Sequence, residues 1–299
     1  MNLVITESPR DAMQGLHEYI PAQTKADYIN SLLKAGFDII DAGSFVSEKA
    51  IPQLKDTAEV LSKLELSDTS PEIMVLVANA KGIEMACASK VVTWLAFPYS
   101  VSPTFLKRNI NSDMKQGLQL IELANDLCEK SHKKLKVYLT MGFGNPYGDR
   151  YDTDIVMASV TKLHAMGIRY ITLSDITGVS TPELITQVYT QLISAFPSIE
   201  FGLHLHTTAN TYYEKVDAAY QSGCRSFDTV LNGMGGCPMT GYELLGNLNT
   251  LDLIEWCKEK NIDTKINAKD LLPAMTKNIE MSLKNAVTLL MKQKSKQTL

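Results

Sequence analysis

Residues 200–210 read Glu-Phe-Gly-Leu-His-Leu-His-Thr-Thr-Ala-Asn, and the interpretation of the whole chain is organised around them. Apolar residues alternate through Phe201 and Leu203, which is the pattern of a β-strand. Side chains i and i+2 of a strand point to the same face, so His204 and His206 are predicted to face one way at its carboxyl end. Two neutral imidazoles placed like this form half of a divalent-metal site. The alternative is two buried, hydrogen-bonded histidines without a metal.

Strand-like and helix-like segments alternate on both sides of this stretch. Seven more strands are predicted at residues 3–5, 37–41, 73–77, 91–96, 135–139, 170–174 and 227–231. Helices are predicted at about 24–36, 54–64, 81–88, 113–131, 153–166, 181–195, 209–222, 241–259 and 268–293. This alternation predicts an α/β fold, a (β/α)8 TIM barrel, as a single domain over 1–299 with a C-terminal helical extension at 268–299. A dinucleotide-binding fold is disfavoured because no Gly-x-Gly-x-x-Gly motif follows the first strand.

The composition excludes several classes of function. The chain has 299 residues, a net charge of −4 and a pI of about 5.8, so we expect no nucleic-acid partner and no membrane-binding polybasic segment. No apolar run reaches the roughly 18 residues of a transmembrane helix, and the N-terminus has no signal-peptide pattern. The five cysteines are an odd number without a Cys-x-x-Cys pair, which favours free thiols and a cytoplasmic location.

Polar residues occur where the predicted strands end, which is where the active site of a (β/α)8 barrel lies. The sequence offers Glu7, Arg10, Asp11, Asp41, Ser44, Tyr138, Thr140, Ser174, Asp175, Thr177, His204, His206, the segment 232–238 and Asn247. A carboxylate, two imidazoles and an amide oxygen that converge would suit a divalent cation with positions left open for a substrate.

Several motifs resemble those of the 3-hydroxy-3-methylglutaryl-CoA (HMG-CoA) lyases, in the same order and over essentially the whole chain. Residues 8–14, Ser-Pro-Arg-Asp-Ala-Met-Gln, resemble the Gly-Pro-Arg-Asp-Gly-Leu-Gln opening of that family. Residues 39–47 and 173–179 are similar to its second-strand and sixth-strand segments. Residues 235–238, Gly-Gly-Cys-Pro, with Gly-Asn-Leu at 246–248, resemble its Gly-Gly-Cys-Pro and Gly-Asn-Leu signature.

The resemblance implies a divalent-metal-dependent carbon–carbon lyase that cleaves HMG-CoA to acetoacetate and acetyl-CoA. It implies that Mg²⁺ or Mn²⁺ is held by Asp11, His204, His206 and Asn247. It also implies catalytic roles for other residues: Arg10 would stabilise a developing oxyanion, Cys237 would lie near the reacting carbon on a loop that closes over the substrate, His204 is a second candidate for the proton donor, and Asp41 and Asp175 would shape the polar site.

Four departures from the family pattern keep other functions open. Asp41 stands where the family usually has Glu, Thr207 where it has Asp, Gly15-Leu16-His17 where it has Asn-Glu-Lys, and Leu251 where an acidic residue is common. The alternatives are a related lyase for a different acyl-CoA, a Claisen-type synthase that joins an acyl-CoA to a 2-oxo acid, and a metal-binding barrel without turnover.

The sequence leaves the roles of two further segments undecided. Residues 107–109, Lys-Arg-Asn, would either meet the phosphates of an acyl-CoA or form a solvated loop. The aliphatic stripe of 268–293 would pack on the barrel or on a partner subunit, and we expect a homo-oligomer, a dimer or larger.

Overall fold

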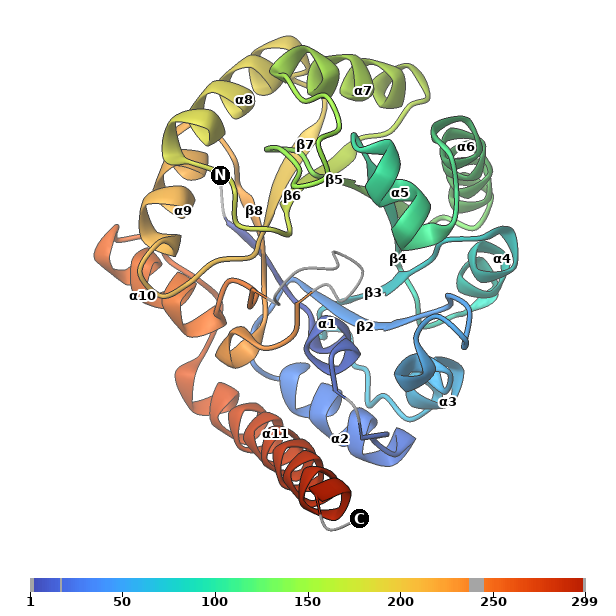
Figure 1. Ribbon diagram of the computed structural model, residues 1–299, viewed down its shortest axis with the longest axis vertical. Coiled ribbons are helices and arrows are strands. Elements are labelled where there is room, and N and C mark those ends of the chain that lie inside the picture. Colours follow the sequence, from blue (N-terminus) through green and yellow to red (C-terminus); the bar gives the residue numbers. More distant parts are fainter. Residues whose placement is uncertain (1–2, 17, 237–244, 298–299) are drawn as a thin grey trace.

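The computed structural model describes residues 3–16, 18–236 and 245–297, and eight parallel strands close into a barrel in sequence order (Figure 1). Hydrogen bonding between the first and last strands closes the ring, with Val4 opposite Ser226 and Thr6 opposite Asp228. The strands are β1 (Val4–Glu7), β2 (Ile39–Ser44), β3 (Glu72–Leu76), β4 (Trp94–Ser100), β5 (Lys134–Thr140), β6 (Tyr170–Asp175), β7 (Glu200–Leu205) and β8 (Ser226–Thr229). The predicted TIM barrel is therefore confirmed.

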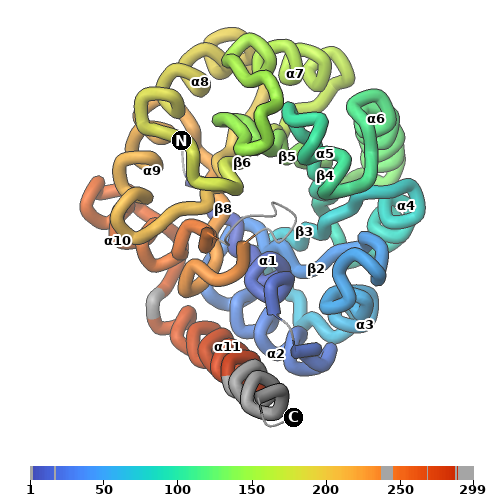
Figure 2. The backbone as a smooth tube through the Cα atoms, in the orientation of Figure 1, coloured from blue at the N-terminus to red at the C-terminus, as the bar shows by residue number. Residues whose placement is uncertain are grey.

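Helices surround the strands, most of them in an outer ring, while α1 and α5 lie nearer the centre, at the mouth of the barrel (Figures 1 and 2). They are α1 (Pro9–Gln14), α2 (Ala22–Leu32), α3 (Thr57–Ser62), α4 (Ala80–Ala88), α5 (Pro103–Ile110), α6 (Met114–Lys130), α7 (Thr153–Ala165), α8 (Pro182–Ala195), α9 (Tyr212–Gln221), α10 (Thr250–Glu259) and α11 (Ala268–Gln297), with the 3-10 turns η1 (Pro52–Leu54) and η2 (Leu231–Gly233). Over the described part of the chain, none of them is long and apolar enough to cross a membrane.

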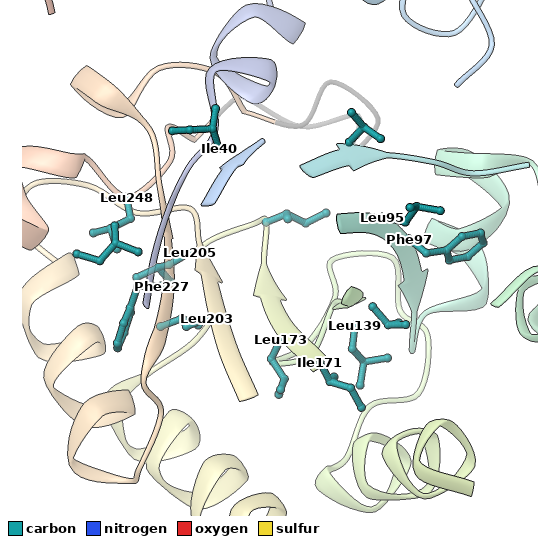
Figure 3. Packing of buried hydrophobic residues seen from close by; sticks show 14 of the residues in the cluster. Ile40, Leu95, Phe97, Leu139, Ile171, Leu173, Leu203, Leu205, Phe227 and Leu248 are labelled. Atoms are coloured by element: carbon teal, nitrogen blue, oxygen red, sulfur yellow. The ribbon is translucent and has the colours of Figure 1, made fainter. Parts of the chain in front are cut away.

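Two hydrophobic layers stabilise the barrel. The larger layer lies between strands and helices, and Figure 3 shows part of it, including Leu95, Leu139 and Phe227. A smaller separate cluster contains Ile39, Met74, Trp94, Ala96 and Tyr138. Since side chains two apart on a strand share a face, Ile39 faces the same way as Asp41. The smaller cluster therefore fills the barrel beneath the polar residues, and strands buried on both faces explain the continuous apolar runs of the sequence.

The segment 245–249, which precedes α10, differs from the sequence prediction. Of the helix predicted at 241–259, residues 241–244 lie outside the described residues, and helix α10 begins at Thr250, where the side chain of Asn249 accepts a hydrogen bond from the N–H of Leu251. Residues 245–249 are extended, and Asn247 pairs with His206 while Asn249 pairs with Val230. Hydrogen bonds to two neighbouring strand ends outweigh the local helical pattern here.

A second difference concerns residues 107–109, which lie on helix α5 rather than in a loop. Ser102 accepts a hydrogen bond from the N–H of Phe105, and Pro103 occupies the first helical position. This is the start signal that correctly predicted α8 at Thr181 and Pro182. Its recurrence at Ser102 was available in the sequence, and the helix brings Arg108 to the mouth of the barrel.

Candidate active site

Asp11, His204 and His206 meet at the carboxyl ends of β1 and β7, as the sequence predicts. Nε2 of His204 lies 3.2 Å from Nε2 of His206 and 3.8 Å from Oδ2 of Asp11. One potential ligand atom from each of the three residues lies within 4.8 Å of the other two. The three side chains are almost completely buried. Asp11 lies on α1, immediately after β1, whereas His204 lies on β7 and His206 just beyond its end. The carboxyl end of the barrel therefore brings the three side chains together.

Asn247, the fourth predicted ligand, lies beside this cluster on the extended segment 245–249. Its backbone pairs with His206, and its side-chain Nδ2 donates a hydrogen bond to the carbonyl of Met234 at 2.8 Å. Gly235 packs directly on this group, since a Cβ at that position would lie 2.5 Å from the Asp11 carbonyl oxygen. Asn247 is 4% exposed, so its amide belongs to the buried centre.

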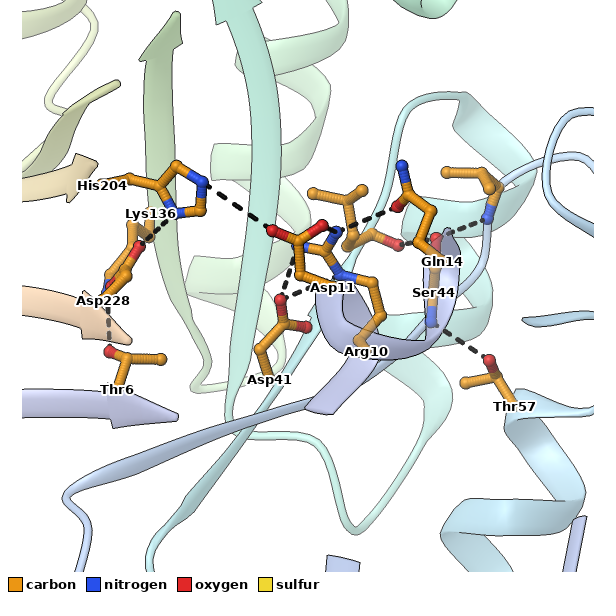
Figure 4. A network of polar contacts seen from close by, with 12 residues as sticks. Thr6, Arg10, Asp11, Gln14, Asp41, Ser44, Thr57, Lys136, His204 and Asp228 are labelled. Atoms are coloured by element: carbon orange, nitrogen blue, oxygen red, sulfur yellow. Dashed lines mark hydrogen bonds and ion pairs between the residues drawn. The ribbon is translucent and has the colours of Figure 1, made fainter. Parts of the chain in front are cut away.

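Two functional residues that the sequence analysis missed lie under His204. Oδ2 of Asp228 is 3.4 Å from Nδ1 of His204, and Oδ1 of Asp228 is 3.6 Å from Nζ of Lys136 (Figure 4). Asp228 is paired with His204 in the register of β7 and β8, so both side chains face the barrel interior. The available signal was a charged residue inside an apolar strand, as in Leu135-Lys136-Val137, because a buried charge needs a partner.

Arg10 links the cluster to a third carboxylate. Its Nε and Nη2 lie 2.9 and 2.6 Å from Oδ2 of Asp41, and its Nη1 lies 3.2 Å from Oδ1 of Asp11 (Figure 4). Gln14 accepts another hydrogen bond from Nη1 at 3.1 Å. The guanidinium is thus held in one plane by partners on three sides. The second oxygen of Asp41 is buried and makes no hydrogen bond within the described residues.

The pKa values of His206 and Asp11 favour a neutral imidazole and an ionised carboxylate, the forms that can bind a metal ion. Burial, together with the neighbouring His204, lowers the pKa of His206 to about 4, so its ring is neutral at pH 7. Burial is the largest single influence on Asp11 and acts to raise its pKa, but the Arg10 guanidinium and the other groups around the carboxylate together outweigh it and hold that pKa below its ordinary value. Burial likewise acts to raise the pKa of Asp228, but Lys136, His204 and Tyr138 together outweigh it and lower that pKa to about 2.

The other predicted site residues lie further from the cluster or outside the described residues. Asp175 accepts hydrogen bonds from the N–H groups of Thr177, Val179 and Ser180, and Nζ of Lys215 lies 3.8 Å away. Its carboxylate therefore shapes the loop after β6. Cys237 falls outside the described residues.

A cavity of about 550 Å³ opens directly over the cluster. Its floor includes Arg10, Asp11, His204 and His206 together with Gln14 and Tyr138. The rim includes residues of α5, among them Phe105, Arg108 and Asn109. It also includes Val46, Ser47, Lys49, Ala50 and Ile51, which follow β2. A polar, charged floor and a partly basic rim suit a small anionic group carried on a longer, negatively charged molecule.

The donor set fits a divalent cation. Two imidazole Nε2 atoms and a carboxylate oxygen point at one another, and at most one proton can lie between the rings. Nearby, the centre has three buried carboxyl groups, Asp11, Asp41 and Asp228, and burial raises the pKa of Asp41. The buried cations beside them are Arg10 and Lys136. A cation bound by these nitrogen and oxygen donors would satisfy the facing lone pairs of the two imidazoles and would offset the negative charge of the carboxylates. These side chains therefore form a candidate metal site.

Comparisons with known proteins agree with this geometry. The family model described as HMGL-like matches residues 3–277. The chain is 29% identical over 266 residues to a hydroxymethylglutaryl-CoA lyase of Bacillus subtilis, which covers 89% of this chain and 88% of that protein. It is 30% identical over 271 residues to the mitochondrial hydroxymethylglutaryl-CoA lyase of Mus musculus, covering 91% and 82%.

Solved structures show the same relationship. An HMG-CoA lyase from Acinetobacter baumannii, in complex with coenzyme A and 3-methylmalate, matches with a TM-score of 0.86 and 30% identity, covering 94% of this chain and 91% of that chain. The HMG-CoA lyase from Brucella melitensis matches with a TM-score of 0.87 and 26% identity, covering 94% and 98%. All of these similar proteins are named as lyases, which does not favour the synthase alternative.

Proposed function

The chain belongs to the HMGL-like family, and we propose on this premise that it is a metal-dependent lyase that cleaves HMG-CoA to acetoacetate and acetyl-CoA. The observation that carries the proposal is the convergence of Asp11, His204 and His206 beneath a cavity whose floor also presents Arg10. Cleavage removes the proton of the C3 hydroxyl and breaks the C2–C3 bond. The C3 carbonyl of acetoacetate forms, and the acetyl-CoA enolate then takes up a proton at carbon.

We propose that Asp11, His204, His206 and Asn247 hold Mg²⁺ or Mn²⁺. When bound, such a cation supplies a Lewis acid that lowers the cost of charge on the substrate oxygens. Asp228 holds the His204 ring from its Nδ1 side, which leaves Nε2 directed at the centre. Lys136 beside Asp228 favours the charged carboxylate that this orientation needs.

Arg10 would act on the substrate rather than on the metal. Burial acts to lower its pKa, but the carboxylates of Asp41 and Asp11 outweigh it and raise that pKa above its ordinary value. The group therefore stays charged and fixed where negative charge develops on the enolate oxygen. Fixed donors of this kind need no reorganisation during the reaction, which is the main source of their catalytic effect.

The rim of the cavity would take the nucleotide part of the acyl-CoA. Two basic residues line the cavity: Lys49, in the segment after β2, and Arg108, on α5. Cys237 would act near the reacting carbon on a closing loop, and Asp175 would position the β6 loop. Alkylation of Cys237 with substrate protection tests the first of these roles. A homo-oligomer and a cytoplasmic location stay predictions.

A direct assay tests the proposal. Purified protein with HMG-CoA and Mg²⁺ or Mn²⁺ should release acetoacetate and acetyl-CoA in equal amounts, without free CoA thiol. Chelation should stop the reaction and added metal should restore it. Free thiol released from acetyl-CoA in the presence of a 2-oxo acid would indicate a synthase instead. Turnover of another 3-hydroxyacyl-CoA but not HMG-CoA would identify a related lyase, consistent with the shorter carboxylate at Asp41.

A further inference from the structure

The C-terminal helix α11 contacts the segment next to the candidate site through Asn278, whose side chain is completely buried. Nδ2 of Asn278 donates to the hydroxyl of Tyr28 on α2 at 3.0 Å. Its Oδ1 accepts from Nδ2 of Asn232 on η2 at 2.7 Å. A buried amide that is bonded at both ends has a fixed orientation. Figures 1 and 2 show α11 lying beside α2 on the outside of the barrel, so Asn278 joins an outer helix to the β8 end.

The segment that Asn278 holds is the one that contacts Asn247. The carbonyl of Gly233 accepts the N–H of Asn247 at 3.1 Å, and the carbonyl of Met234 accepts its side-chain Nδ2 at 2.8 Å. Asn232 has a φ of 61°, a left-handed conformation that few residues other than glycine adopt. The side-chain Nδ2 of Asn232 donates to Oδ1 of Asn278, and this hydrogen bond ties the left-handed turn to α11.

Ser282 extends the same contact one turn further along α11. Its hydroxyl lies 2.9 Å from the sulfur of Met234 and also donates to the carbonyl of Asn278 at 2.8 Å. The helix therefore contacts both ends of the segment 232–234. Since Nδ2 of Asn247 is tied to Met234, the direction of its Oδ1 is set by the position of this segment. The oxygen is the atom that a hard cation would bind.

We propose that Asn278 is a positioning residue through which α11 fixes segment 232–234, and thereby the Asn247 amide, at the metal centre. The inference rests on the proposed metal site. It assigns the C-terminal helix a function in metal binding in addition to its packing on α2. A purely structural role would lower the stability of the fold without a selective effect on metal affinity.

Two variants break the Asn232–Asn278 hydrogen bond from opposite sides. Asn278→Leu removes the buried amide at similar volume. Asn232→Gly acts at an exposed position whose left-handed φ glycine accepts, so it keeps the fold intact if the first variant fails to fold. Tyr28→Phe is the matched control, because it removes the other hydrogen bond of Asn278 and leaves the contact with Asn232.

Mn²⁺ affinity of the full chain, measured by electron paramagnetic resonance of the free ion, distinguishes the outcomes. We expect the dissociation constant to rise about fivefold or more in Asn278→Leu and Asn232→Gly, and to change less than twofold in Tyr28→Phe at a similar loss of thermal stability. Unchanged Mn²⁺ affinity in Asn232→Gly, or an equal loss in Tyr28→Phe, would overturn the inference while leaving the proposed function intact. A parent protein that binds no Mn²⁺ would remove the proposed metal site and this inference together.

Discussion

His204 and Asp228 form a side-chain pair across adjacent strands, with Nδ1 of His204 3.4 Å from Oδ2 of Asp228. The pair is in register between β7 and β8, so backbone hydrogen bonding fixes the side chains relative to each other. A carboxylate on one ring nitrogen selects the tautomer that leaves the other nitrogen free for a metal. The orientation of the His204 ring is therefore set by Asp228, which is not one of the predicted metal ligands.

Asp228→Asn should weaken metal binding while the barrel stays folded. The variant removes the carboxylate charge that lies 3.4 Å from Nδ1 of His204, so we expect the Mn²⁺ dissociation constant to rise about tenfold or more. Isothermal titration with Mn²⁺ measures the effect. Asp217→Asn, which removes a carboxylate paired with Lys260 on the outer helices, is the control and should bind Mn²⁺ like the parent. Equal affinities in all three proteins would contradict the role of Asp228.

Arg10→Lys should reduce turnover more than substrate binding. Lysine keeps the charge but loses the planar fork that contacts both Asp41 and Asp11. We expect kcat to fall by about two orders of magnitude, or ~2.7 kcal/mol of transition-state stabilisation. Arg150→Lys changes an exposed guanidinium and should leave kcat unchanged. Turnover by Arg10→Lys near that of the parent would exclude the proposed contact with the enolate oxygen.

Gly235→Ala should disturb the centre through a direct contact. A Cβ there would lie 2.5 Å from the carbonyl oxygen of Asp11 and 3.1 Å from Nδ2 of Asn247. Gly148→Ala is the matched control, because it has a similar positive φ with nothing within 4 Å of the added Cβ. Both variants should lose about 1 kcal/mol of stability from backbone strain. Only Gly235→Ala should also lose kcat and Mn²⁺ affinity; a parallel loss in both would mean that strain alone is responsible.

Glu7→Gln should change how stability depends on pH. Glu7 accepts hydrogen bonds from Leu231 N–H and Thr250 Oγ1, and burial raises its pKa from 4.5 to about 7. Because the folded-state pKa lies above the unfolded one, the stabilising contribution is complete below about pH 4.5 and is lost as pH rises through 7.

The neutral variant avoids that loss. Relative to the parent, Glu7→Gln should therefore gain up to about 3 kcal/mol of unfolding free energy between pH 5 and pH 8.5. Urea denaturation at several pH values measures the difference, with the exposed Glu48→Gln as a control. A constant difference across this range would show that Glu7 does not titrate there.

The sequence by itself predicted the eight strands, most of the helices and the candidate metal ligands. Alternation of apolar residues predicted strand β7 and the common direction of His204 and His206, because the two-residue period of a strand is a local property. The order of strands and helices then predicted a closed parallel barrel, in which Asp11 must lie at the same end as the histidines.

Only the tertiary structure decided what holds these ligands in place. Asp228 lies beside His204 because β7 and β8 are neighbouring strands, and Lys136 pairs with Asp228 from β5, which is not adjacent to either strand. The spacing of residues along one strand does not specify which buried charges meet inside the closed barrel. Segment 245–249 is extended rather than helical because it pairs with His206 and Val230. Asn278 contacts Asn232 across 46 residues. Contacts of this kind depend on the packing of whole elements, which short-range patterns do not specify.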